Sequence, residues 1–452
     1  MLERFFSPRS VAVIGASRKP KSLGHVLLKN IIDGGFGGDI FPINPRAESI
    51  LGLKAYPSIS EVRGHVDLAI VMVPSSIVLD ITRQCGEKGV KGVVIISAGF
   101  SEIGNAKLER ELAEEADRWG IRVIGPNCAG IIDTNSNLFA TIESRIGRGN
   151  IAFVTQSGAL GGAVLAWAAN EGIGFSKFIS YGNACDVDES DLLSYLSADK
   201  DTKVITLYIE GVRDGTKFMR VARDVSPKKP IIAIKGGLSK AGAGAVHSHT
   251  GAMAGNSRIY LSVFRQVGII HASGIEDMFD MAKALVYQRR APGHNVVVLT
   301  NSGGPAVMAV DELESLGLSL PEPSGEIRER LDFLPPFYSV NNPIDLTAQG
   351  DPEMYARVFR SLLSDGYYDA GIVICVPPLS LDAAEVAEAI VEVSKDIDKP
   401  IVACWMAGRL VERAVRILEE NKIPNYPTPR RAAKALSVLM EKESMNPQPG
   451  SP

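Results

Sequence analysis

Short apolar runs alternate along this chain with longer amphipathic stretches, and glycines stand at many of the junctions. Four runs near the amino end, at 11–14, 68–73, 93–96 and 123–124, consist almost entirely of β-branched and other apolar residues. Such runs are typical of strands buried on both faces of a parallel sheet, with helices as connections. The pattern therefore predicts a first α/β domain that ends near residue 145, in a polar stretch rich in glycine.

The rest of the chain contains an internal repeat. The segment 151–158, IAFVTQSG, aligns with 296–303, VVVLTNSG, and Gly172 falls on Gly317 at the same offset. Three later pairs keep the same order along the chain: Asn183 with Asn342, Asp186 with Asp345, and Lys229 with Lys399. Each copy is predicted to begin with a strand, turn at Thr-x-Ser-Gly and enter a helix.

Three domains and a tail follow from these patterns. The domains are expected at 1–145, 146–291 and 292–443, which agrees with about 150 residues per domain in a chain of 452 residues. The second boundary lies in a stretch rich in arginine, proline and glycine. The tail at 444–452 has almost nothing to bury and is predicted to be disordered.

Composition and charge exclude several classes of protein. Apolar residues make up 45% of the chain and charged residues 22%, as in ordinary globular domains. The net charge is −4 and no stretch concentrates basic residues, which argues against a nucleic-acid partner. No apolar run of about 18 residues and no signal core is present, so we expect a cytoplasmic protein without a membrane span. The five cysteines form no Cys-x-x-Cys pair, and we predict neither a disulfide framework nor a metal site.

Each copy of the repeat offers a helix start to an anion. The first turn of a helix has unpaired N–H groups and a partial positive charge, and glycine there lets an anion come close. The candidate phosphate-binding residues are Gln156, Ser157, Gly158, Ser302, Gly303 and Gly304. An ordinary serine N-cap is the alternative at either helix. A hydrolase nucleophile at Ser157 is a further alternative, although Thr155 stands where the Gly-x-Ser-x-Gly motif needs glycine.

The strand ends of the first domain carry small or backbone-exposing residues, in the crevice where open parallel sheets bind ligands. Gly15 is not followed by Gly-x-Gly-x-x-Gly spacing, and Asn44 stands where an NAD-binding fold places an acidic residue. A nucleotide-containing ligand other than NAD is therefore predicted, with an ordinary loop as the alternative at any single position. The candidate residues are Gly15, Ala16, Ser17, Asn44, Pro45, Arg46, Val73, Pro74, Ser97, Ala98, Gly99, Pro126 and Asn127.

Two further candidates lie in the second domain. A long loop predicted at 236–252 contains His247 and His249, and an imidazole that is unprotonated near neutral pH can act as a nucleophile. A solvated pair of histidines is the alternative. Glu210 follows the predicted strand at 204–209, where a carboxylate can hold one nitrogen of an imidazole and leave the other free to attack. A salt-bridged glutamate at the rim agrees with the sequence equally well.

These residues resemble the alpha subunits of ADP-forming acyl-CoA (acetyl-CoA) synthetases, relatives of succinyl-CoA synthetase, over nearly the whole chain. The resemblance rests on the strand-end motifs of the first domain, on the two Ser-Gly helix starts, and on His249-Thr250-Gly251-Ala252, which is similar to the family's phosphohistidine loop. It implies a Rossmann-like CoA-binding domain followed by two flavodoxin-like, succinyl-CoA synthetase-like domains with parallel sheets.

The resemblance also implies a reaction and a partner. His249 would carry a phosphoryl group, Glu210 would steady that histidine, and the two helix starts would hold the phosphate. Acyl-CoA, ADP and phosphate would give a small acid, CoA and ATP through an acyl phosphate and a phosphohistidine. The three domains leave no room for an ATP-grasp domain, so ADP or ATP and Mg²⁺ would bind to a separate beta subunit in an α2β2 assembly. The alternative is a non-catalytic CoA-binding regulator or scaffold of the same fold.

Overall fold

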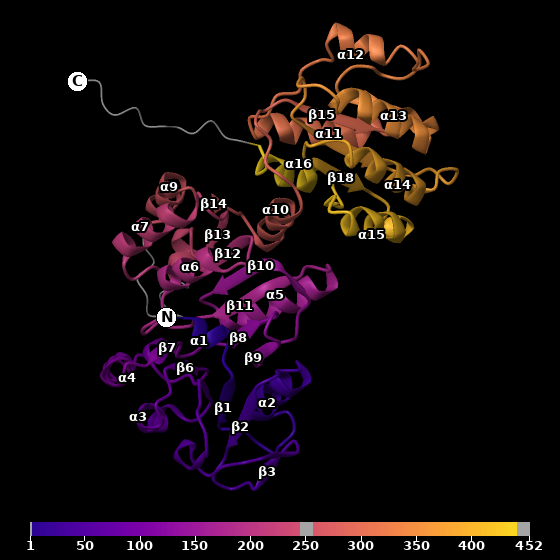
Figure 1. Cartoon of the computed structure of the whole chain (residues 1–452). Helices are drawn as coiled ribbons and strands as arrows, with labels where there is room; N and C mark the ends of the chain where they lie inside the picture. The colour runs from indigo at the N-terminus through magenta and orange to yellow at the C-terminus, as the bar shows by residue number, and fades with distance from the viewer. Residues whose placement is uncertain (1, 245–255, 441–452) are drawn as a thin grey trace, which may run out of the picture. The chain divides into compact units, whose positions relative to one another are not determined.

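The computed structural model describes residues 2–244 and 256–440, in two compact units, Met1–Ile275 and Glu276–Pro452 (Figure 1). The predicted tail at 444–452 lies outside the described residues. In both units strands and helices alternate along the chain, which confirms the predicted α/β class. None of the described helices is long and apolar enough to cross a membrane.

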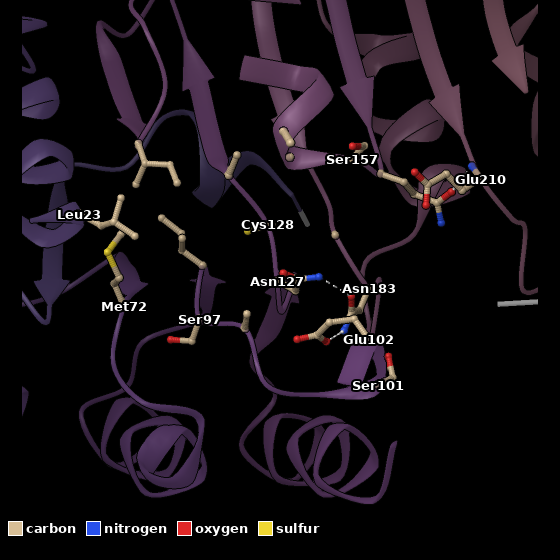
Figure 2. A pocket seen from close by; sticks show the side chains of 18 of the residues that line it. Leu23, Met72, Ser97, Ser101, Glu102, Asn127, Cys128, Ser157, Asn183 and Glu210 are labelled. Carbon is tan, nitrogen blue, oxygen red and sulfur yellow. Dashed lines mark hydrogen bonds between the residues drawn. The ribbon is translucent and has the colours of Figure 1, made fainter. Parts of the chain in front are cut away.

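A five-stranded parallel sheet forms the amino-terminal part of the first unit. Its strands, in spatial order, are β2 (Asp39–Ile43), β1 (Ser10–Ile14), β5 (Leu68–Val71), β6 (Gly92–Ile95) and β7 (Arg122–Ile124), with helices α2 (Leu23–Asp33), α3 (Val78–Glu87) and α4 (Ala106–Trp119) between them in sequence. The strand order reverses between β1 and β5, and sheets of this kind bind ligands at the carboxyl ends beside the reversal. Met72 and Ser97 follow β5 and β6 at this edge (Figure 2).

A seven-stranded sheet completes the first unit. Its strands, in spatial order, are β14 (Ile270–His271), β13 (Ile231–Lys235), β12 (Val204–Ile209), β10 (Arg148–Thr155), β11 (Phe175–Ser180), β8 (Gly130–Asp133) and β9 (Leu138–Thr141). Helices α5 (Gly158–Asn170), α6 (Glu189–Ala198), α7 (Gly215–Val225) and α9 (Ser257–Val267) accompany it. The pairing is parallel except at the hairpin of β8 and β9, which joins β11 antiparallel. In sequence the hairpin lies before residue 145, within the first predicted domain, but in space it belongs to the second sheet. The predicted domain boundaries stay predictions.

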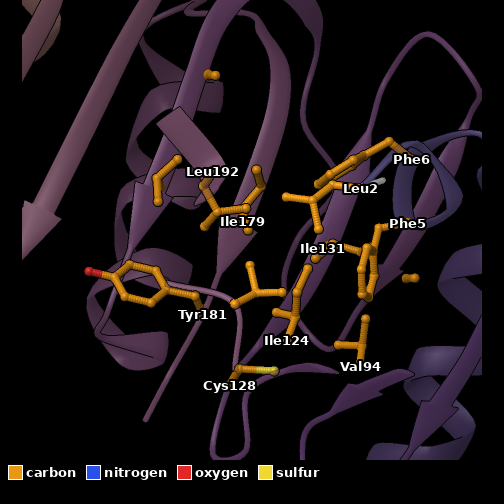
Figure 3. Close-up of a cluster of buried hydrophobic side chains, with 14 of the residues drawn as sticks. Leu2, Phe5, Phe6, Val94, Ile124, Cys128, Ile131, Ile179, Tyr181 and Leu192 are labelled. Carbon is orange, nitrogen blue, oxygen red and sulfur yellow. The ribbon is translucent and has the colours of Figure 1, made fainter. Parts of the chain in front are cut away.

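One hydrophobic cluster extends from the first sheet to the second. Figure 3 shows Phe5 and Phe6 of the short helix α1 (Glu3–Phe6) in one cluster with Ile131 of β8 and Ile179 of β11, all of them buried. Beside it, the buried Lys177 Nζ lies 3.0 Å from carboxylates of Asp133 and Asp199. Apolar burial and a paired charge therefore hold the hairpin on the second sheet.

The second unit contains a four-stranded parallel sheet in the order β16 (Ile344–Asp345), β15 (Val296–Thr300), β17 (Ala370–Cys375) and β18 (Ile401–Trp405). Its longer helices are α10 (Ile275–Tyr287), α11 (Gly303–Ser315), α13 (Pro352–Leu363), α14 (Ala383–Ser394), α15 (Glu412–Glu420) and α16 (Pro429–Ser437). The division between the units falls at the start of α10, before the predicted boundary at residue 291.

The internal repeat is present in three dimensions. The order β16-β15-β17-β18 of the second unit corresponds to β11-β10-β12-β13 of the first. Both copies also share a turn: the Thr155 hydroxyl donates to the carbonyl of Ser157 and accepts from its N–H, and Thr300 makes the same two bonds with Ser302. Thr-x-Ser therefore fixes the same path from strand to helix twice.

Candidate active site

A cavity of about 1210 Å³ in the first unit brings many of the predicted site residues together (Figure 2). It is lined by loops that follow β5, β6, β7, β9, β11 and β12 and by the starts of α2 and α5. A space of this size can take a ligand as large as a nucleotide cofactor. The predicted residues in its lining are Val73, Pro74, Ser97, Ala98, Asn127, Gln156, Ser157, Gly158 and Glu210.

The other strand-end candidates stand outside this lining. At the ends of β1 and β2, the Asn44 side-chain amide donates to the carbonyl of Ala16 at 2.7 Å. The backbone of Gly15 touches that of Met72, which lines the cavity. The candidates outside the cavity lining are Gly15, Ala16, Ser17, Asn44, Pro45, Arg46, Gly99 and Pro126. Gly99 and Pro126 are next in sequence to the lining residues Ala98 and Asn127, and the other six form a group at the ends of β1 and β2 that meets the cavity where β1 and β5 end.

Gly15 allows the close approach between this group and the cavity lining. Its φ is +94°, and a Cβ there would lie 2.0 Å from the carbonyl oxygen of Met72. Gly15→Ala is therefore expected to lower the urea midpoint of unfolding and to weaken CoA binding, because the two strand ends must move apart. Gly35→Ala is the control, since Gly35 also has a positive φ, +77°, but has nothing within 4 Å of an added Cβ. Equal midpoints for the two variants would contradict the expectation.

The start of α5 lies at the cavity and presents first-turn amides to it. The Ser157 hydroxyl accepts from the N–H of Leu160 at 3.3 Å, so Ser157 is an N-cap of this helix. A cap satisfies one of the unpaired amides and leaves others of the first turn for a ligand. Gly158 and Ala159 line the cavity and keep this helix end free of bulky side chains.

Gln156 and Glu210 are tied together beside this helix start. The side-chain oxygen of Gln156 accepts from the backbone N–H of Glu210 at 2.5 Å and of Gly211 at 3.0 Å, so its amide nitrogen is the group left for an anion. Glu210 is 7% exposed and lines the cavity. Below it, Lys235 Nζ donates to the carbonyl of Glu210 at 2.8 Å. Burial lowers the pKa of Lys235, and the carboxylate of Glu210 opposes that shift.

The remaining candidates are the two histidines and the helix start of the second copy of the repeat. His247 and His249 lie outside the described residues, and within the loop predicted at 236–252 residues 240–244 are helical. Ser302, Gly303 and Gly304 stand at the start of α11 in the second unit, where the Ser302 side chain makes no capping hydrogen bond.

A polar network on the cavity wall was not predicted from the sequence. The Asn183 side-chain amide donates to Glu102 at 2.7 Å and accepts from Asn127 at 3.2 Å (Figure 2). It also donates to Glu109 at 2.9 Å. Arg213 donates to Glu109 at 2.7 Å. Burial opposes ionisation of Glu102, but hydrogen bonds from Gly99, Asn183 and Phe100 outweigh it and lower the pKa of this carboxyl. Asn127 is one of the predicted site residues and Asn183 is a match within the repeat, whereas Glu102, Glu109 and Arg213 had no signal in the sequence.

Glu143 is a further unpredicted residue of the cavity lining. Burial raises the pKa of its carboxyl. Among the residues that the structure describes, no three His, Cys, Asp or Glu side chains are grouped to hold a metal ion.

Family models match three consecutive parts of the chain. The CoA binding domain matches residues 9–134, the succinyl-CoA ligase like flavodoxin domain matches residues 148–285, and the ligase-CoA domain matches residues 296–445.

Individual relatives match the chain as a whole. It is 45% identical to the alpha subunit of acetate–CoA ligase [ADP-forming] II from Pyrococcus furiosus, with 98% of each chain covered. It is 44% identical to acetate–CoA ligase [ADP-forming] I from Archaeoglobus fulgidus, with 97% of this chain but 63% of that protein covered. A solved structure of the dinucleotide forming acetyl-coenzyme A synthetase 1 of Ca. Korarchaeum cryptofilum, in complex with phosphate and ADP, matches with a TM-score of 0.93 and 41% identity, covering 97% of this chain and 96% of that one.

Proposed function

The chain belongs to the family of ADP-forming acetate–CoA ligases, as an alpha subunit, and on this basis we propose how its residues divide the reaction. The cavity binds the thioester end of acyl-CoA, and phosphate binds at the start of α5. A phosphate oxygen attacks the thioester carbonyl, the C–S bond breaks, and CoA leaves an acyl phosphate behind. An imidazole nitrogen of His249 then takes the phosphoryl group and releases the acid. ADP on a partner subunit finally takes that group and becomes ATP.

The shared cavity is the observation that carries this proposal. Strand-end residues of the CoA-binding part, such as Val73 and Ser97, line the same space as Ser157 and Gly158 at the helix start (Figure 2). A thioester and an anion can therefore meet there. Phosphoryl transfer depends mainly on positioning and on stabilisation of charge, which helix amides and a buried glutamate can supply.

We assign ADP or ATP and Mg²⁺ to a separate beta subunit with an ATP-grasp domain, in an α2β2 assembly. The chain spans 98% of the Pyrococcus alpha subunit but 63% of the Archaeoglobus ligase. About a third of the Archaeoglobus protein therefore lies outside the match. This extra length supports the proposal that a separate partner supplies nucleotide binding to this chain. In the same proposal, Glu210 steadies the phosphorylated histidine, and Ser302, Gly303 and Gly304 form a second phosphate-binding helix start.

The isolated chain is expected to bind CoA and to form no ATP. Its CoA-binding part is complete, whereas its nucleotide site is assigned to the partner. Calorimetry with CoA and with NAD measures the first half, and an assay for ATP formation from acetyl-CoA, ADP and phosphate measures the second. NAD binding without CoA binding would contradict the assignment of CoA as the ligand. ATP formation by the isolated chain would contradict the assignment of the nucleotide site to a partner.

Reconstitution with the beta subunit distinguishes a catalytic subunit from the alternative function, a CoA-binding regulator or scaffold. The chain copurified with its beta subunit is expected to form ATP from a thioester, and a panel of acids then defines the acyl group in the reverse direction. A complex that binds CoA but turns over no thioester would favour the regulator.

A further inference from the structure

Glu143 is placed against the backbone of α5 in an unusual way. Both of its carboxylate oxygens lie where a Cβ on Gly162 would be, at 2.0 and 2.8 Å from that position. Glycine is less favourable than alanine inside a helix. Gly162 leaves the space that the carboxylate occupies.

The backbone around Glu143 is held in place before any ligand binds. The Asn30 side-chain amide of α2 donates to the carbonyl of Thr141 at 2.8 Å and to that of Glu143 at 3.0 Å. The Thr141 hydroxyl donates to the carbonyl of Ala129 at 2.7 Å and accepts from the N–H of Glu143 at 3.1 Å. The carboxylate is therefore preorganised at the wall of the cavity.

This carboxylate lies close to the place of acyl transfer. Gly162 comes four residues after Gly158, which is about 6 Å along a helix. Glu143, Ser157, Gly158 and Ala159 line the same cavity. A thioester whose carbonyl carbon is attacked by phosphate at the helix start therefore has its sulfur within about one helical turn of Glu143.

The charged side chains near Glu143 pair with other groups or line the cavity, so the Glu143 carboxylate is available to a ligand. Helix α5 and strand β9 carry no charged side chain. On α2, Lys29 pairs with Asp33, and Arg145 donates to the carbonyl of Asp33. Three other charged side chains line the cavity, Glu102, Glu210 and Arg213. Within 2–244 and 256–440, no hydrogen bond or ion pair occupies the Glu143 carboxylate, and its environment favours the protonated form more than water does.

We propose that Glu143 is the proton-transfer residue of the thiol half of the reaction, an inference that rests on the proposed function. When CoA attacks the acyl phosphate, the S–H proton goes to a carboxylate oxygen of Glu143. The sulfur bonds to the acyl carbon, and the bond from that carbon to the phosphate oxygen breaks. In the other direction phosphate attacks the thioester, the C–S bond breaks, and the departing sulfur takes the proton back from Glu143.

The test is the pH dependence of acetyl-CoA formation from acetyl phosphate and CoA, measured with the copurified complex without ADP. With Glu143 present, the rate needs an ionised carboxylate and a protonated thiol, so kcat/KM stays flat between their pKa values. In Glu143→Gln the reaction must use thiolate from solution. Its rate is expected to fall about 100-fold or more at pH 7 and to rise about tenfold per pH unit up to the thiol pKa near 8.5.

Two other variants exclude a merely structural role. Gly162→Ala favours the helix but displaces the carboxylate, and it is expected to reproduce the sloping profile in a folded protein. Glu171→Gln, at the exposed far end of the same helix, is expected to keep the wild-type profile.

Three outcomes separate this proposal from the function on which it rests. Phosphorylation of the Glu143→Gln complex by ATP and its Kd for CoA are expected to match wild type. A profile parallel to wild type, or a loss confined to CoA affinity, would overturn proton transfer and leave Glu143 as a binding residue. A wild-type complex that neither forms acetyl-CoA nor accepts a phosphoryl group would overturn the proposed function itself, and this assignment with it.

Discussion

Replacing His249 with glutamine is expected to abolish turnover and phosphorylation of the chain together. Glutamine keeps a polar side chain of similar reach but has no nitrogen that can carry a phosphoryl group. The measurement is incubation of the complex with radiolabelled ATP, followed by acid and base treatment of the chain. Label on a histidine is expected to be lost in acid and retained in base, and to be discharged by acetate and CoA.

His247→Gln is the matched control, because both histidines stand in the same segment of sequence. This variant is expected to retain most of the label and most of the turnover. His249 is followed by Thr250-Gly251-Ala252, which agrees with the family's His-x-Gly-Ala, and His247 has no such sequel. Label that survives in His249→Gln and disappears in His247→Gln would move the role to His247. Label that survives in both variants would favour the non-catalytic alternative.

Replacing Glu210 with glutamine is expected to lower turnover about 10²- to 10⁴-fold while CoA affinity stays nearly unchanged. The substitution preserves the shape of the side chain and removes its charge, which would otherwise stabilise a positively charged imidazole. The Glu210 backbone N–H donates to the Gln156 side-chain oxygen and the Glu210 carbonyl accepts from Lys235, and the substitution keeps both of these backbone hydrogen bonds.

The rate of phosphorylation by ATP and the Kd for CoA are measured in parallel for the Glu210→Gln complex. A slower phosphorylation with an unchanged Kd supports a role on the histidine. Weaker CoA binding with normal phosphorylation would move Glu210 to the CoA site, and unchanged turnover would leave it a structural residue.

Local sequence patterns predicted the strands and the repeat well, because both depend on short-range signals. The runs at 11–14, 93–96 and 123–124 are strands β1, β6 and β7 within one residue at either end, since uninterrupted apolar residues suit a sheet that is covered on both faces. The turn at Thr-x-Ser is equally local, and it has the same hydrogen bonds in both copies.

Features that depend on distant parts of the chain were not predicted. Strand β8 pairs with β11, which lies some 45 residues later in the chain. The apolar pattern of a strand does not indicate which other strand it pairs with. Glu143 was missed because its place depends on a single missing side chain at Gly162. The partners of Asn183 come from α4 and from the loop after β6, and no spacing in the sequence relates them.

The hairpin of β8 and β9 constrains how ligands can enter and leave the cavity. An opening of the first sheet away from the second would break either the three residue pairs between β8 and β11 or the hydrogen bonds from Asn30 of α2 to the carbonyls of Thr141 and Glu143. We therefore expect a ligand to enter the cavity without separation of the two sheets. In the proposed reaction the bound thioester and the amides of α5 then stay together, and the group that moves is the phosphoryl group.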